Sequence, residues 1–239
     1  ARDRGIESLG HLIATEFKQA AVKQEVPLSG VALHTGKKVT LVFKPAPENH
    51  GYAFQRIDLE GSPIIEASAN YVTDTKRGTT LDKRGVQINT CEHVLAALVG
   101  LEIDNCLIEI DSSEPPIMDG SSKFFIEALE KAGKIEQDQF REEYVVKEII
   151  SYKDEETGSE IMLMPADSYQ ITTMVDFGTM VLGTQNATLN KISDFKDEIS
   201  NARTFSFLHE IEMLLEHGLI KGGDLNNAIV YVDKELSEK

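Results

Sequence analysis

Apolar and polar residues alternate along most of the first half of the chain, which is typical of half-buried β-strands. Alternating segments cover 25–33 and 37–45. They flank His34-Thr35-Gly36, which predicts a three-residue hairpin loop with glycine in the left-handed position. Further strands are predicted in YAFQRID (52–58), TTLDKRGVQIN (79–89) and NCLIEID (105–111).

Helical patterns interrupt these strands at two places. One covers 91–99, and the other comes after a Pro-Ile-Met-Asp-Gly segment, covers 121–133 and ends at Gly133. We interpret Asp119 of that segment as a cap for the second helix. Residues 1–22 have the pattern of a marginal amphipathic helix with no evident connection to the strands after it, so they are interpreted as a linker.

A polar stretch at 136–143 separates this block from a second one, and a domain boundary is predicted there, between 23–138 and 139–239. The second block only partly repeats the order of the first, which suggests a repeat that is cut short. Its predicted elements are a hairpin over 144–167, a strand over 169–177, helices over 193–202 and 207–218, and a strand over 228–232.

The charge and apolar content narrow the function classes. A net charge of −16 argues against nucleic acid and anionic membranes as partners, because both require a basic surface. No apolar run approaches the roughly 18–20 residues that span a bilayer. We therefore expect a cytoplasmic protein without stable membrane insertion. Cys91 and Cys106 have no metal or redox spacing and are expected to be reduced.

The pair Glu92-His93, at the start of the first predicted helix, carries the candidate chemistry. Thr90 is predicted as the N-cap, which places the pair at the second and third helical positions. The positive end of the helix dipole favours a carboxylate and a neutral imidazole. A neutral imidazole beside a carboxylate is what a metal site with a general base requires, so the pair indicates metal-assisted hydrolysis.

The pair alone also fits a surface feature or a plain contact with the helix dipole. It does not match the known zincin motifs, which need a second histidine where Asn89 stands.

Four stretches together resemble one family. LSGVALHTGKKVTL (28–41), NTCEHVLAALVGLEIDN (89–105), PPIMDGSS (115–122) and ARTFSFLHEIEMLLEHGLIKGGDLNNAIV (202–230) are similar to the zinc-dependent UDP-3-O-acyl-N-acetylglucosamine deacetylases of lipid A biosynthesis. The resemblance covers about residue 23 to the last residues. It implies an α+β fold of two related layered sandwich domains, with helices packed between sheets and the second domain incomplete here. It leaves 1–22 as a non-family segment.

The resemblance also implies a role for particular residues. Glu92 matches the general base that activates a zinc-bound water, and Thr204 matches the hydroxyl that stabilises the oxyanion. His93 matches a zinc ligand. The substrate-binding positions are Phe177, which stacks on uracil, Phe205 near the metal, Ile211 and Ile220 in an acyl-chain insert at about 208–223, and His34. By spacing alone the aromatic residues and Ile211 fit an ordinary core, and Thr204 fits a helix cap near Ser206.

The family completes its zinc site with further residues that this sequence does not contain before Lys239. The expectation is therefore an inactive fragment of a longer hydrolase that removes acetate from UDP-3-O-acyl-N-acetylglucosamine. The alternative is a shortened, non-catalytic homologue that acts as a binding or interaction module. Some family members are fused to a downstream dehydratase domain. An anionic substrate requires cationic side chains at the cleft, for which the candidates are Lys76, Arg77, Arg203 and Lys221.

Overall fold

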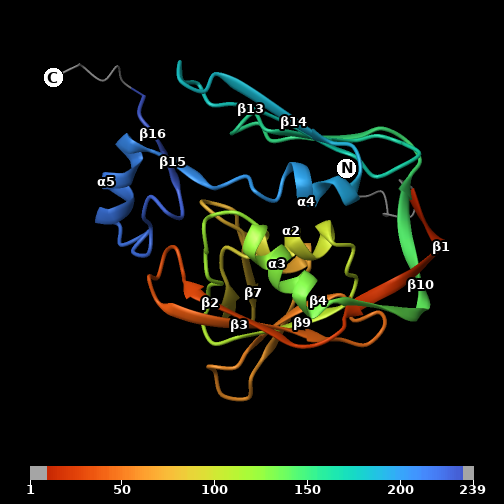
Figure 1. Cartoon of the computed structure of the whole chain (residues 1–239). Helices are drawn as coiled ribbons and strands as arrows, with labels where there is room; N and C mark the ends of the chain where they lie inside the picture. The colour runs from red at the N-terminus through yellow and green to blue at the C-terminus, as the bar shows by residue number, and fades with distance from the viewer. Residues whose placement is uncertain (1–9, 234–239) are drawn as a thin grey trace.

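The computed structural model describes residues 10–233, which form a protein of mixed α and β structure (Figure 1). The strands of the first half are β1 (Gly10–Val22), β2 (Val26–Val31), β3 (Lys38–Pro45), β4 (Tyr52–Arg56), β5 (Ile64–Glu66), β6 (Val72–Asp74), β7 (Thr80–Lys83), β8 (Val86–Ile88) and β9 (Cys106–Ile110). Those of the second half are β10 (Lys134–Val146), β11 (Ile150–Lys153), β12 (Glu160–Leu163), β13 (Ile171–Asp176), β14 (Thr184–Leu189), β15 (Phe205–Phe207) and β16 (Ile229–Tyr231). The helices are α2 (Glu92–Gly100), α3 (Lys123–Ala132), α4 (Phe195–Glu198) and α5 (Leu208–Glu216), with 3-10 turns at Ala69–Tyr71 and Ile192–Asp194.

Two sheets and two helices organise the first half. The larger sheet has the order β2-β3-β9-β4-β5, and its pairs are antiparallel except for the parallel pair β4 and β9. The smaller sheet, β6-β7-β8, is antiparallel. Helices α2 and α3 pack against each other above the larger sheet, as the centre of Figure 1 shows.

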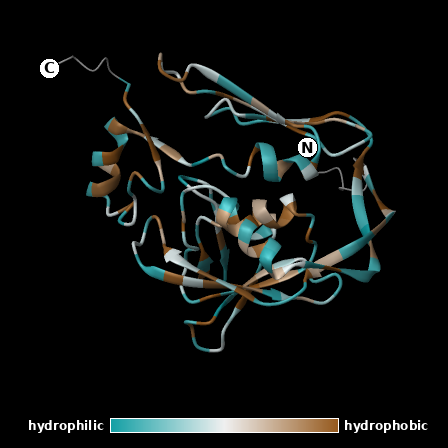
Figure 2. Ribbon diagram, viewed as in Figure 1, coloured by the Kyte–Doolittle hydropathy of each residue, from teal (hydrophilic) through white to brown (hydrophobic). Residues whose placement is uncertain are grey.

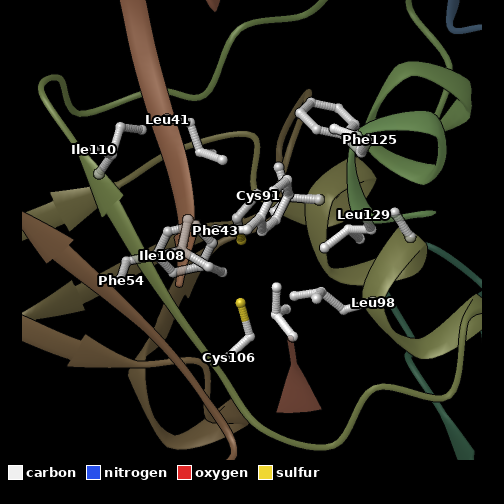
Figure 3. Close-up of a cluster of buried hydrophobic side chains, with 14 of the residues drawn as sticks. Leu41, Phe43, Phe54, Cys91, Leu98, Cys106, Ile108, Ile110, Phe125 and Leu129 are labelled. Carbon is white, nitrogen blue, oxygen red and sulfur yellow. The ribbon is translucent and has the colours of Figure 1, made fainter. Parts of the chain in front are cut away.

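One apolar core joins these four parts. Phe43 and Ile108 come from the larger sheet, Leu81 from the smaller one, Leu98 from α2 and Phe125 from α3. The rings of Phe43 and Phe125 meet edge to face, with centroids 6.4 Å apart. Figure 3 shows side chains of this core pointing toward one another, with the two cysteines among them. The segments before and after α2 therefore pack against a close-packed core.

The second half consists of separate pairs of strands. β11 pairs with β12 and β13 with β14, both antiparallel, while β15 and β16 form a short parallel pair. Apolar side chains of the β11–β14 hairpins, such as Ile161 and Met174, are exposed. Helix α5 carries both brown apolar and teal polar segments in Figure 2, as expected of an amphipathic helix.

The helix predicted within residues 1–22 is wrong for the part that the structure describes. Gly10–Val22 is a strand paired with β10, with irregular register around Lys18. Its last residues, Ala20, Ala21 and Val22, are buried, and the N–H of Ala20 donates to Asp104 Oδ2 at 2.8 Å. Pairing with β10 and with the Asp104 segment outweighs the weak helical propensity of this stretch. Residues 1–9 lie outside the described part.

Most other predicted elements are confirmed, but the helix predicted over 193–202 is reduced to α4 and the 3-10 turn before it, and β5, β6 and β14 were not predicted. The three-residue loop predicted at His34-Thr35-Gly36 is wrong in length, because the turn between β2 and β3 spans 32–37 and is closed by the Ala32 N–H to Lys37 carbonyl bond. Gly36 has the expected positive φ of 68°. β10 runs continuously through the predicted domain boundary, which stays a prediction. No helix within residues 10–233 is long and apolar enough to cross a membrane.

Candidate active site

Helix α2 presents Glu92 and His93 in its first turn. The helix begins at Glu92, one residue later than expected, and its N-cap is Cys91, whose side chain makes no capping bond. The prediction that Thr90 is the cap is therefore wrong. Thr90 has a φ of 52°, and its hydroxyl donates to Glu114 Oε1 at 3.3 Å instead.

Among the residues that the structure describes, the Glu92 carboxylate is held by a hydrogen bond at one oxygen only. Its Oε2 accepts the N–H of Thr79, the residue just before β7, at 2.9 Å. The preceding residue is Gly78, and a Cβ placed there would lie 3.5 Å from Glu92 Oε1. The Gly78 backbone thus lies close to the carboxylate, and Oε1 accepts no hydrogen bond from the residues that the structure describes. The arrangement fixes the carboxylate and leaves one oxygen available to accept a proton.

His93 is kept neutral by its surroundings. Burial lowers the pKa of its imidazole, and the nearby carboxylates of Glu92 and Asp119 offset only part of that effect. The sequence predicted a neutral imidazole from the helix dipole, and the structure shows burial as the main cause. The backbone carbonyl of His93 accepts the Ser122 hydroxyl at 3.0 Å, which ties α2 to the start of α3.

Asp119 does not cap α3 as predicted. Its Oδ1 accepts the N–H of Ser121 at 3.0 Å and the hydroxyl of Ser121 at 2.6 Å, so it closes a turn before the helix, whose N-cap is Ser122. This turn brings the carboxylate close enough to His93 to affect its pKa.

A cleft of about 980 Å³ lies beside the residues that lead into α2, and neither Glu92 nor His93 lines it. Its walls come from the β2–β3 turn, the loop between β6 and β7, the residues before α2, Glu114 and α5. The lining residues are His34, Thr35, Asp74, Lys76, Arg77, Gly78, Thr80, Asn89, Thr90, Glu114, Met213, Leu214, His217 and Leu219. A second cavity, of about 580 Å³, lies between β1 and β10 and includes none of the predicted site residues.

Two of the four cationic candidates line the cleft. Arg77 reaches from the β6–β7 loop to α5 and donates to both carboxylate oxygens of Glu210, at 2.9 and 3.2 Å. These hydrogen bonds hold the pKa of Glu210 below its ordinary value. Lys76 also lines the cleft, whereas the guanidinium of Arg203 donates to the backbone carbonyls of Asp119 and Leu225.

Thr204 lies against the turn that carries Asp119. Its N–H donates to the Gly120 carbonyl at 2.7 Å, and its own carbonyl accepts the Ile229 N–H at 3.0 Å. It precedes β15 and caps no helix, so the alternative of a cap near Ser206 is wrong. The turn thus brings Thr204 and His93 to the same part of the molecule, although 111 positions separate them in the sequence.

Phe177 and Phe205, predicted to bind substrate, are in contact. Their rings meet edge to face with centroids 5.3 Å apart. Phe205 is 38% exposed and also contacts Phe207 and Tyr231. The sequence did not indicate Tyr231 as part of this cluster, because β16 pairs with β15 only in the folded chain.

The predicted acyl-chain insert contains α5 and the loop after it. Met213, Leu214 and Leu219 give the cleft its apolar wall, while Ile211 and Ile220 are half-buried. Ile220 has a φ of 47°, which is a strained conformation for a β-branched residue. The next residues dock on the β2–β3 turn, where the Gly222 N–H donates to the Leu33 carbonyl at 2.9 Å. His34 lines the cleft, and its Nδ1 is buried without a hydrogen-bond partner among the described residues.

The expected zinc needs three protein ligands and a water. Within residues 10–233, no three His, Cys, Asp or Glu side chains are grouped to hold a metal ion. His93 supplies one suitable nitrogen, and the carboxylates of Glu92 and Asp119 lie close enough to affect its pKa. The arrangement of the described residues therefore offers a metal ion fewer than three grouped ligands.

The fold and the site define a mixed α/β protein with a carboxylate and a neutral imidazole beside a partly apolar cleft. A family model described as UDP-3-O-acyl N-acetylglycosamine deacetylase (LpxC) matches residues 19–239. The chain belongs to this family, as the resemblance of its sequence motifs predicted.

Curated relatives agree with this assignment. The chain is 47% identical to the bifunctional enzyme LpxC/FabZ of Bacteroides thetaiotaomicron, over 93% of this chain and 48% of that protein. It is 44% identical to the protein of the same name from Porphyromonas gingivalis, over 92% and 48%. It is 42% identical to the UDP-3-O-acyl-N-acetylglucosamine deacetylase of Myxococcus xanthus, over 90% and 68%. The chain thus spans about half the length of the first two relatives.

Proposed function

We propose that this chain is the part of a UDP-3-O-acyl-N-acetylglucosamine deacetylase that carries the general base. The observation that supports this most directly is the geometry of Glu92 beside His93. Its Oε2 is fixed by the Thr79 N–H, and its Oε1 accepts no hydrogen bond from the described residues. Family membership and the name of the Myxococcus relative support the substrate, a UDP-linked N-acetyl sugar with an acyl chain.

The proposed reaction is hydrolysis of the acetamide. Glu92 takes one proton from a water as the water oxygen bonds to the carbonyl carbon. The carbonyl oxygen becomes negative, and the Thr204 hydroxyl is the proposed donor to it. The bond from carbon to nitrogen then breaks as a general acid, proposed to lie outside these 239 residues, gives the nitrogen a proton. The products are the 2-amino sugar nucleotide and acetic acid, which ionises to acetate.

The remaining roles are proposals at the same site. Phe177 is assigned to uracil and Phe205 to the substrate near the reacting group, supported by the contact between their rings. Ile211 and Ile220 belong to the proposed acyl-chain insert. Met213, Leu214 and Leu219, which lie between them in the sequence, form the apolar wall of the cleft, and this supports the assignment. His34 is proposed to contact the substrate, and its place in the lining of the cleft supports this.

The larger organisation is proposed from the family. We propose two related sandwich domains with a boundary near 138, acting in the cytoplasm. The bifunctional names of the Bacteroides and Porphyromonas relatives support a fused downstream dehydratase in the complete protein. We also propose Zn²⁺ as the cofactor, with His93 as one ligand and further ligands from sequence outside these 239 residues, since the first relatives are about twice as long. A bound zinc would act as a Lewis acid toward water and carbonyl.

The proposed function is tested with Glu92→Gln in the full-length protein. Gln keeps the shape of the side chain and the oxygen that accepts the Thr79 N–H, but it cannot take the proton. We expect the rate of acetate release to fall by about 10²- to 10⁴-fold, the usual contribution of a general base. The measurement is kcat on UDP-3-O-acyl-N-acetylglucosamine, with zinc content determined in parallel and expected to be unchanged.

Glu127→Gln is the matched control, because Glu127 lies on the exposed face of α3 and forms only a long ion pair with Lys123, at 3.9 Å. It should retain wild-type turnover. If Glu92→Gln also retained it, Glu92 would not be the base. A wild-type protein that binds the substrate without releasing acetate would instead support the non-catalytic homologue.

A further inference from the structure

Glu114 is a buried carboxylate at the wall of the cleft that the proposed reaction does not use. Its residue is 1% exposed, and it lies in the segment between β9 and the Asp119 turn. Burying a carboxylate is costly unless hydrogen bonds replace its water. The groups that donate hydrogen bonds to Glu114 therefore explain why it can be buried at this position.

The hydrogen bonds to Glu114 come from two separate parts of the cleft. The N–H of His34 donates to Oε1 at 3.0 Å and to Oε2 at 3.2 Å, and the N–H of Thr35 donates to Oε2 at 3.0 Å. From the other side, the Thr90 hydroxyl donates to Oε1 at 3.3 Å. One side chain thus connects the β2–β3 turn to the residue that leads into α2.

Both connected parts carry proposed site residues. The β2–β3 turn carries His34, whose ring lines the cleft. Thr90 stands two residues before Glu92 and has a positive φ of 52°. A β-branched residue holds this conformation only where its surroundings enforce it. The bond to Glu114 is one such contact, and it fixes the direction in which the chain enters α2.

We propose that Glu114 is a positioning residue, which holds the His34 turn and the entry to the Glu92 helix in one geometry across the cleft. This inference rests on the proposed deacetylase function. Glu114 acts through His34 and Thr90 and does not touch the reacting atoms. Its role differs from simple support of the fold, because the groups that it joins face the substrate side of the cleft.

The test is Glu114→Gln in the full-length protein. In either orientation, the new amide NH₂ faces a main-chain N–H, that of His34 or that of Thr35, where the carboxylate accepted a hydrogen bond. We expect kcat/KM for acetate release to fall by about 10- to 100-fold, the range found when a group that orients a site residue is changed. His34→Ala and the double variant complete a mutant cycle.

A positioning role predicts a specific outcome of that cycle. In the His34→Ala background, Glu114→Gln should lower kcat/KM by a smaller factor than in the wild-type background, because one of the two parts that it holds has lost its site side chain. Equal, multiplicative losses in both backgrounds would overturn the inference, as would wild-type kcat/KM in Glu114→Gln. Glu114→Asp, which keeps the charge, takes the same place in the cycle if the Gln variant is not recovered folded.

Asp111→Asn is the matched control. Asp111 lies three residues earlier, is exposed, and accepts the Thr40 N–H at 2.8 Å outside the cleft. It should retain wild-type kcat/KM, and a loss equal to that of Glu114→Gln would mean that the effect is one of general stability. Glu92→Gln distinguishes the two proposals: an inactive Glu92→Gln with a wild-type Glu114→Gln overturns only the positioning role.

Discussion

Cys91 and Cys106 are single residues whose chemistry is set by the core around them. Burial raises the pKa of each thiol to about 12. At pH 8 only about one in ten thousand of these thiols is ionised, and the thiolate is the reactive form. We expect neither cysteine to react with a disulfide reagent in the native protein and both to react in urea. Rapid modification of the native chain would contradict this.

The raised pKa values of the two thiols also predict how the free energy of unfolding changes with pH. The unfolded thiols ionise near pH 9, while the folded ones stay protonated until about pH 12. Over that interval the native state binds more protons than the unfolded state, so the free energy of unfolding falls as pH rises. Urea denaturation at pH 8 and pH 10.5 measures the change. Replacing Cys106 by Ala should reduce the pH dependence, because one of the two titrating groups is gone.

At the scale of residues, the sequence indicated the Glu92-His93 pair because both residue types stand together at a helix start. It could not indicate Glu114, because nothing in the sequence distinguishes this acidic residue, which stands before two prolines, from the other acidic residues. The function of Glu114 arises only when the β2–β3 turn and Thr90 come within hydrogen-bond distance of it. The roles of Thr204 and Phe205 came from the family motif, and the structure adds their contacts with Gly120 and Phe177.

At the scale of elements, the Asp119 turn and the β15–β16 pair depend on a close approach at Gly120. Gly120 has a φ of 86°, and a Cβ there would lie 2.1 Å from the Asn227 carbonyl oxygen. Gly120→Ala should therefore displace the Asn227 segment and Thr204, in addition to about 1–2 kcal/mol for the left-handed backbone itself. We expect a lower free energy of unfolding and a lower kcat.

Gly61→Ala is the control for the backbone contribution. Gly61 has a similar φ of 75°, with nothing within 4 Å of an added Cβ. Both variants are measured by urea denaturation, and the difference between their losses reports the clash at Asn227. Equal losses would show that the Asp119 turn and the Asn227 segment adjust without cost.

The elements that the sequence predicted well share a regular pattern and a clear end. α3 has a strong apolar face and ends before Gly133, whose φ is 77°. The sequence did not predict β1, because buried and exposed residues do not alternate regularly along it. Its strand conformation comes from pairing with β10, more than 100 positions away. The strand predicted over 228–232 is confirmed as β16, whereas β15 was not predicted, since a strand of three residues is defined mainly by its pairing partner.

At the scale of the whole molecule, the two halves of the chain meet around the cleft. The Arg77–Glu210 pair joins the β6–β7 loop to α5, and the Gly222 N–H joins the second half to the β2–β3 turn. The first half supplies Glu92 and His93, and the second half supplies Thr204 and the apolar wall. The site is therefore a product of the assembled molecule, and neither half contains all of its proposed groups.

The arrangement of potential ligands in the folded molecule predicts how much zinc the protein retains. His93 is one nitrogen donor, and residues 10–233 group no three potential ligands. We therefore expect the 239-residue chain to retain little zinc after dialysis and the full-length protein to retain one zinc per molecule. His93→Ala should remove that zinc, whereas His50→Ala should not, because the ring of His50 contacts the Gly51 carbonyl away from the cleft. Atomic absorption measures all four proteins. Stoichiometric zinc in the 239-residue chain that depends on His93 would mean that residues of this chain complete the site, and that its geometry changes when the metal binds.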